Sequence, residues 1–204
     1  LLKHVTTNVF IVFAKSIDFT FVLGYNNAKS RFSKSRLDSI RGVFMFIGRE
    51  TELKFLNDKY NSDGGQLVVL YGRRRVGKTE TLREFCKEKP HVFFSCTQTT
   101  DRVQLQKFSK QTLKENIPAK NYITEFADWE KAFGAVLDLP YGDKKKLFII
   151  DEFPYMCKGN KSIPSILQNL WDTQLRDSNV MIVLCGSAMS FIEKEILAEK
   201  NPLY

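Results

Sequence analysis

From residue 46 onward, short apolar runs alternate with segments whose apolar residues recur at helical spacing. The apolar runs have the length and composition of strands: Gln66–Tyr71, His91–Cys96, Leu147–Ile150 and Val180–Cys185. The periodic segments predict helices over residues 50–60, 78–89, 103–116, 126–137, 163–176 and 190–200. Strands that alternate with helices predict a mostly parallel sheet covered on both faces, so we expect a three-layer α/β/α domain.

Residues 1–44 differ from the rest because their apolar patches, such as Val9–Ala14, follow no persistent helical or strand period. Met45 stands directly before a segment that reads like the start of a domain. Our hypothesis is that translation begins at Met45 and that 1–44 is upstream sequence read in frame, with a partial domain over 46–204. The alternative is that residues 1–44 are a native N-terminal extension of the protein. A signal peptide is disfavoured because the apolar run is short and charged residues follow it.

Composition narrows the functional classes. The net charge is +8, but residues 1–44 carry seven basic and two acidic groups, which leaves 24 basic and 21 acidic groups in the remainder. A nearly balanced body gives little support for DNA binding by the core. No apolar run approaches the ~20 residues of a membrane span, and four cysteines without C-x-x-C spacing indicate reduced thiols in a cytoplasmic protein.

The segment that follows the first predicted strand has the pattern G-x-x-x-x-G-K-[ST]. Glycines let the backbone fold tightly, so that successive N–H groups and the start of a helix point at phosphate oxygens. Lys78 is expected to bridge the β- and γ-phosphates, and the Thr79 hydroxyl to bind Mg²⁺. Three consecutive arginines either contact phosphates, face a partner or nucleic acid, or are solvated. The expected nucleotide-binding set is Gly72, Arg73, Arg74, Arg75, Val76, Gly77, Lys78, Thr79 and Glu80.

Two other predicted strands end in polar residues. Asp151 and Glu152 follow the run Leu147–Ile150, and the carboxyl ends of parallel strands meet at one edge of a sheet. We expect Asp151 to hold Mg²⁺ and Glu152 to act as the general base toward water. Ser187 follows the last strand, where a hydroxyl can sense the γ-phosphate; the alternative is a helix N-cap.

Several motifs together resemble one family, the archaeal-type ATPases of the STAND/AAA-like branch of P-loop NTPases. The resemblance covers about residues 46–204 and lies in Phe46–Glu50, Tyr71–Thr79, Ile150–Tyr155, Leu167-Gln168, Leu170–Asp172 and Cys185–Ser187. It implies a five-stranded core with the phosphate-binding strand central, ATP hydrolysis by Glu152, and Gly48 and Arg49 lining the nucleoside end. Family members usually continue past the position of Tyr204 with Gly-Arg, a fifth strand, a helical lid and a winged helix, so the sequence predicts a domain that is incomplete at its C-terminal end.

The expected function is Mg²⁺-dependent ATP hydrolysis that acts as a switch or motor for a larger protein. Its partners are ATP and a DNA or protein client bound through further domains, with homo-oligomerisation open and no membrane contact. The alternative is a nucleotide-binding regulatory module without catalysis. A small-molecule kinase is disfavoured, because a glutamate after the Asp would activate water and waste ATP.

Overall fold

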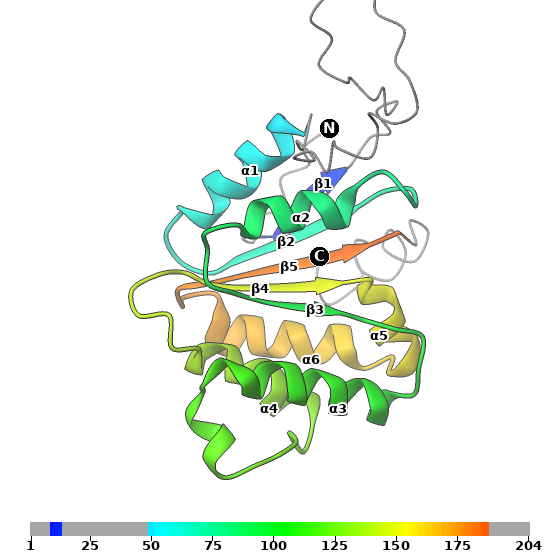
Figure 1. Ribbon diagram of the computed structural model, residues 1–204, viewed down its shortest axis with the longest axis vertical. Helices are drawn as coiled ribbons and strands as arrows, with labels where there is room; N and C mark the ends of the chain where they lie inside the picture. Colours follow the sequence, from blue (N-terminus) through cyan, green and yellow to red (C-terminus); the bar gives the residue numbers. More distant parts are fainter. Residues whose placement is uncertain (1–8, 14–48, 188–204) are drawn as a thin grey trace, which may run out of the picture.

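The computed structural model describes residues 9–13 and 49–187 of the 204-residue chain. Five parallel strands form one sheet in the order β1-β2-β5-β4-β3 (Figure 1). Their bounds are β1 Val9–Phe13, β2 Gln66–Tyr71, β3 His91–Ser95, β4 Lys146–Asp151 and β5 Val180–Gly186. The predicted parallel α/β architecture is therefore confirmed.

The register of the sheet sets which strand ends lie side by side. Tyr71 at the end of β2 is opposite Gly186 of β5, and Ile150 of β4 is opposite Leu184 of β5. The loop after β2, the residues after β4 and Ser187 after β5 thus leave the sheet at the same edge. This edge is where ligands bind in open parallel α/β sheets.

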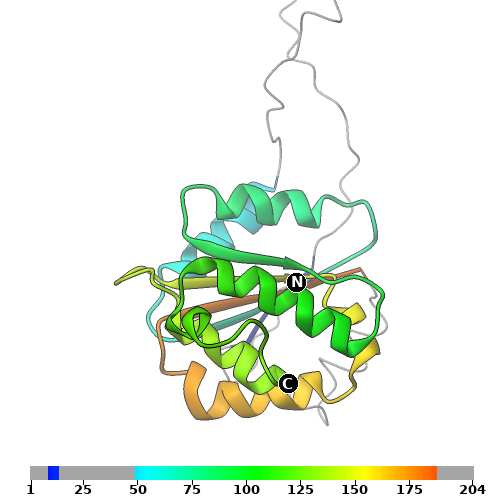
Figure 2. The same ribbon diagram turned by 60° about the horizontal axis from the view of Figure 1, so that its bottom comes forward.

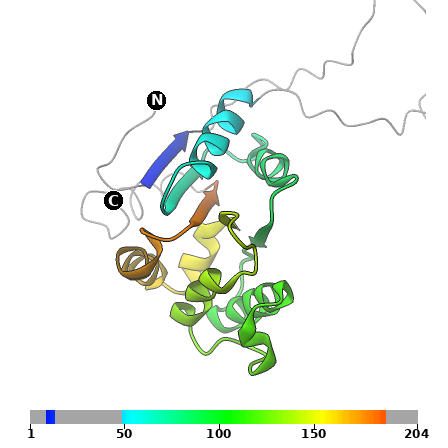
Figure 3. The same cartoon turned by 90° about the vertical axis from the view of Figure 1, so that its left-hand side faces the viewer.

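Helices cover both faces of the sheet, as Figures 1, 2 and 3 show from three directions. On one face lie α1 (Glu50–Tyr60) and α2 (Lys78–Cys86). The other face carries α3 (Asp101–Thr112), α4 (Trp129–Gly134) and α6 (Ile163–Leu170), with the short α5 (Phe153–Gly159) near the carboxyl ends of the strands. Four shorter turns complete the described elements: η2 Leu113–Glu115, η3 Pro118–Asn121, η4 Ala135–Asp138 and the π-helical η5 Trp171–Leu175.

Two hydrophobic cores follow from the alternation of side chains along buried strands. Val68 and Leu70 of β2 point into the smaller core beneath α1 and α2, whereas Leu67 and Val69 point into the larger one. Phe108 of α3 is fully buried in the larger core and makes edge-on ring contacts with Phe94, Trp129, Phe133 and Phe148. Burial on both faces explains why the strands read as continuous apolar runs.

Several element boundaries differ from the sequence-based expectation. The helix expected over 78–89 ends at Cys86, and the one expected over 163–176 turns into a π-helical segment after Leu170. The helix expected from 126 begins at Trp129, because the Asp128 side chain accepts from the Lys131 N–H and caps it. Helix α5 was not predicted, and the helix expected over 190–200 lies outside the described residues.

The sheet also departs from expectation at its β2 side. β1 pairs in parallel with β2, from Val9 with Leu67 to Phe13 with Tyr71, although no strand was predicted within residues 1–44. The middle strand is β5, so the expectation that the phosphate-binding strand is central was wrong: β2 is an inner strand one place from the edge. The division at residue 44 stays a prediction. Within the described ranges, no helix is long and apolar enough to cross a membrane.

Candidate active site at the carboxyl edge of the sheet

The loop between β2 and α2 forms the expected concave turn. Arg75 and Gly77 have φ of 63° and 81°, in the left-handed region, and Gly77 is the N-cap of α2. A cavity of about 360 Å³ opens beside this loop, within the range of small-molecule sites. It is lined by Arg74, Arg75, Gly77, Lys78, Thr79, Glu80, Glu152 and Ser187. Residues 72–79, which we call the cradle, therefore contribute to one cavity together with Glu152 and Ser187, and all were singled out from the sequence.

Lys78 lies inside the cradle and is only 8% exposed. Its ammonium group donates to the carbonyl oxygens of Gly72 at 3.0 Å and Arg73 at 2.8 Å. The Lys78 side chain therefore extends back along the loop toward its first residues. No carboxylate of the described residues is within ion-pair distance of it. A buried cation without a carboxylate partner is suited to an anionic ligand in the same cavity.

Asp151 and Thr79 meet beside the cradle. The Thr79 hydroxyl donates to Asp151 Oδ2 at 2.9 Å, and the backbone N–H of Glu152 donates to Oδ1 at 3.0 Å. A hydroxyl and a carboxylate are hard oxygen ligands, which fit Mg²⁺. No group of three or more His, Cys, Asp or Glu residues that could hold a metal occurs in the described part of the chain. Mg²⁺ usually takes one or two carboxylates from a protein, with phosphate and water completing its shell.

Glu152 sits at the junction of β4 and α5 with φ of 52°, a conformation uncommon for a residue with a side chain. Its two carboxylate oxygens lie 3.4 and 3.3 Å from the Ser187 hydroxyl, which donates to them. Strain of this kind persists where the surrounding structure enforces it, and it is concentrated at functional sites. Glu152 and Ser187, the residues predicted to act as base and to lie near the γ-phosphate, are thus in contact.

Comparison with known proteins is consistent with this geometry. Residues 46–203 match the profile of a family described as an ATPase domain predominantly from Archaea. The chain belongs to this family. The resemblance inferred from the sequence motifs is therefore confirmed, and the chain carries a domain of an ATPase family.

Two relatives of this archaeal ATPase domain come from Methanocaldococcus jannaschii. One, an uncharacterised protein, is 33% identical over 160 residues, which are 78% of this chain and 34% of that protein. The other, an uncharacterised ATP-binding protein, is 48% identical over 48 residues, 24% of this chain and 81% of that protein. The chain thus spans about a third of the length of the first relative.

A solved structure shares the fold of the archaeal ATPase domain. The Walker-type ATPase of Pyrococcus abyssi superposes with a TM-score of 0.54 at 22% identity, covering 78% of this chain and 51% of that chain. The match supports the P-loop ATPase fold.

Arg49 of the ATPase domain does not line the cavity. Its guanidinium, in a side chain that is 8% exposed, pairs with Glu52 at 2.7 Å and donates to the carbonyl oxygen of Val76. Arg49 therefore contacts the cradle backbone at Val76, and its expected place at the nucleoside end stays a prediction. Gly48 lies outside the described residues.

The three arginines of the cradle are all exposed. Arg74 and Arg75 line the cavity, and Arg74 donates to the Tyr155 hydroxyl at 3.2 Å. Arg73 contributes its carbonyl to Lys78. Tyr155 had no predicted role, because its partner is 81 positions away and only the close approach of α5 to the loop brings them together.

A cysteine also contacts the site. Burial raises the pKa of the Cys185 thiol, and its hydrogen bond to Asp151 and the charge of that carboxylate raise it further. The thiol stays protonated and can donate to Asp151. All four cysteines are buried thiols, and burial raises the pKa of Cys86 to about 12. Sequence reasoning missed the Cys185 contact because a thiol at a strand end has no distinguishing pattern.

Proposed function

We propose that this domain binds ATP with Mg²⁺ in the carboxyl-edge cavity and hydrolyses it with Glu152 as the general base. The observation that carries the proposal is the convergence of Lys78, the Thr79–Asp151 pair and the Glu152–Ser187 pair around one cavity. These residues follow three strands, β2, β4 and β5, and the parallel register brings the ends of these strands to one edge.

In this proposal the cradle holds the triphosphate. Backbone N–H groups of residues 73–79 and the start of α2 provide donors, and the Lys78 ammonium exchanges its backbone carbonyl partners for β- and γ-phosphate oxygens. Thr79 and Asp151 would hold Mg²⁺, which would neutralise charge on the β- and γ-phosphates. The exposed side chains of Arg74 and Arg75 are placed to contact phosphate at the rim.

Glu152 and Ser187 act on water and on the γ-phosphate. The Glu152 carboxylate accepts a proton from the attacking water, while Ser187 exchanges its hydrogen bond from Glu152 to a γ-phosphate oxygen. When ATP is bound, the Ser187 hydroxyl would donate to the γ-phosphate, and after loss of the γ-phosphate it would return to Glu152.

The chain covers 34% of one relative, and we propose that the ATP cycle acts within a larger protein. We propose a nucleotide-dependent switch or motor in the cytoplasm, with a DNA or protein client bound by other domains or through homo-oligomers. The second candidate is a nucleotide-binding module without catalysis. The contact of Ser187 with both oxygens of Glu152 favours that candidate if it persists when ATP is bound.

Removal of Mg²⁺ tests the proposed metal site. Chelation with EDTA should weaken ATP binding by the purified chain about tenfold, because one charge-assisted contact is lost. The Asp151→Asn variant should bind ATP weakly with or without EDTA, as measured by isothermal titration calorimetry. Asp138→Asn, exposed in η4 and outside both cavities, is the control and should respond to EDTA as the unmodified chain does. An EDTA response of normal size in Asp151→Asn would refute the assignment of Asp151.

A further inference from the structure

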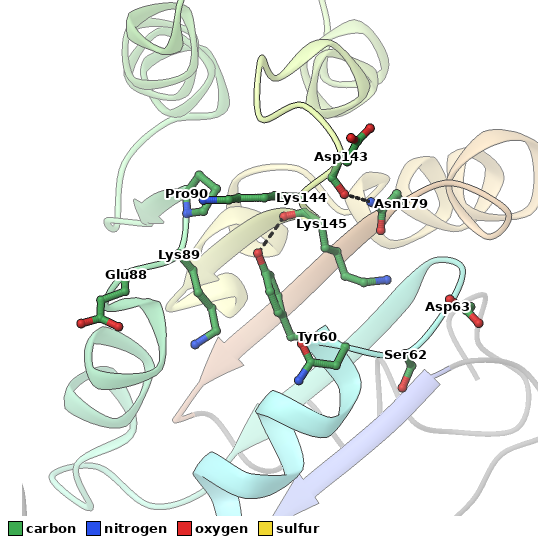
Figure 4. A pocket seen from close by; sticks show the side chains of 11 residues that line it. Tyr60, Ser62, Asp63, Glu88, Lys89, Pro90, Asp143, Lys144, Lys145 and Asn179 are labelled. Carbon is green, nitrogen blue, oxygen red and sulfur yellow. Dashed lines mark hydrogen bonds between the residues drawn. The ribbon is translucent and has the colours of Figure 1, made fainter.

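A second cavity, of about 440 Å³, lies at the amino edge of the sheet (Figure 4). Its walls are the turn after α1, the segment before β3, the turn before β4 and Asn179 before β5. The distance between this cavity and the carboxyl-edge cavity is roughly 20 Å, because strands of six residues lie between them and a strand rises about 3.3 Å per residue. The two cavities are therefore distinct sites.

Lys145 forms part of the wall of this second cavity and is only 5% exposed. Its ammonium group donates to the Gly64 carbonyl at 2.6 Å, which uses one of its three protons. No described carboxylate is within ion-pair distance of it. Burial lowers the pKa of Lys145, and the charge of Asp63 offsets this only in part. An anion in the cavity would stabilise the charged ammonium.

Lys89 supplies a second ammonium group to the same cavity. It donates to the Phe85 carbonyl at 2.8 Å and lies 5.6 Å from the centre of the Tyr60 ring. The Tyr60 hydroxyl donates to the Lys145 carbonyl at 3.3 Å, so the tyrosine stands between the two lysines (Figure 4). In the described chain, Lys89 too has no carboxylate within ion-pair distance.

The acidic residues of the cavity lie at its rim. Asp63, Glu88 and Asp143 are exposed, and Figure 4 shows their carboxylates directed outward. A third lysine, Lys144, is exposed beside Pro90. The wall therefore carries two ammonium groups with spare donors, and such groups bind phosphate oxygens.

We propose that this amino-edge cavity binds phosphate oxygens through the ammonium groups of Lys89 and Lys145, which lie on either side of Tyr60. The ligand is either a small phosphorylated molecule or a phosphate of a nucleic acid strand, which present the same oxygen acceptors. The site lies opposite the ATP cavity and makes use of none of its residues.

Amide NMR with inorganic phosphate tests this site. Phosphate added to the ¹⁵N-labelled chain should change the chemical shifts of the amides of Asn61–Asp63, Lys89 and Lys144. The affinity for phosphate that these shifts report should be about tenfold weaker in Lys89→Met and in Lys145→Met. Methionine keeps the length of the side chain and removes its charge. Lys89→Met leaves the hydrogen bond from Lys145 to Gly64 in place. The control is Lys110→Met, because Lys110 is exposed on α3.

A second titration with oligothymidylate distinguishes the two sources of phosphate. Shifts of the same amides by inorganic phosphate support a small phosphorylated ligand, and shifts by the oligonucleotide alone support a nucleic acid strand. Phosphate will also bind the cradle, so the titration is repeated in Lys78→Ala, where the amino-edge shifts should persist. Shifts confined to residues 73–79, or an unchanged affinity in both methionine variants, would overturn the proposal and leave the ATP site untouched.

Discussion

Replacing Lys78 with alanine is expected to weaken ATP binding by roughly 100-fold, because the ammonium group contributes about 3 kcal/mol through charge-assisted contacts to phosphate. Lys78 is the buried cation of the cradle, and no described carboxylate competes for it. The measurement is calorimetric titration of ATP with Mg²⁺ into the purified chain and the variant.

The control for Lys78 is Lys87→Ala, just after the end of α2, where the side chain is 68% exposed and pairs with Glu84. That variant should bind ATP like the unmodified chain, since a surface ion pair of this kind contributes little. Thermal unfolding of Lys78→Ala separates loss of binding from loss of folding. Undiminished ATP binding in a folded Lys78→Ala variant would remove the cradle from the account.

Replacing Glu152 with glutamine is expected to lower ATP turnover by 10²- to 10⁴-fold, roughly the usual contribution of a general base, and to leave ATP affinity within about twofold. Glutamine keeps the shape of the side chain but cannot accept the proton of water. The hydroxyl of Ser187 can still donate to the remaining amide oxygen, so the site should keep its arrangement. Single-turnover assays with γ-³²P-ATP measure the rate even where it is slow.

Glu130→Gln, exposed on α4, is the matched control for Glu152 and should hydrolyse ATP at the unmodified rate. Equal turnover in the Glu152 variant would exclude this residue as the base. Binding without any hydrolysis in the unmodified chain would instead favour the regulatory module.

Much of the fold follows from the sequence because the strands are buried on both faces. The run Leu147–Ile150 is apolar throughout, and Gln66–Tyr71 is apolar after its first residue. Runs this short beside turn residues indicate strands rather than helices. Helix α5 was missed because Pro154 reads as a helix stop, although proline is tolerated in the first helical turn, where its missing N–H is not needed. The π-helical turn after Leu170 leaves no signal in the apolar spacing.

The site could be predicted as a set of strand ends but not as a set of contacts. The glycine-lysine pattern and the acid pair identify Lys78, Asp151 and Glu152, and parallel pairing brings them to one edge. The contact between Ser187 and Glu152 depends on β4 and β5 being neighbours, and the contact between Arg49 and Val76 depends on the packing of α1 beside the loop. Neither relation is encoded in local spacing.

The central claim is that the loop between β2 and α2 encloses the triphosphate of ATP. A crystal structure with Mg²⁺ and a non-hydrolysable ATP analogue tests it most directly. The account predicts the β- and γ-phosphates in contact with the Lys78 ammonium, and the metal between Thr79 and Asp151. A triphosphate bound elsewhere, including the amino-edge cavity, with Lys78 still bonded to the Gly72 and Arg73 carbonyls, would contradict it.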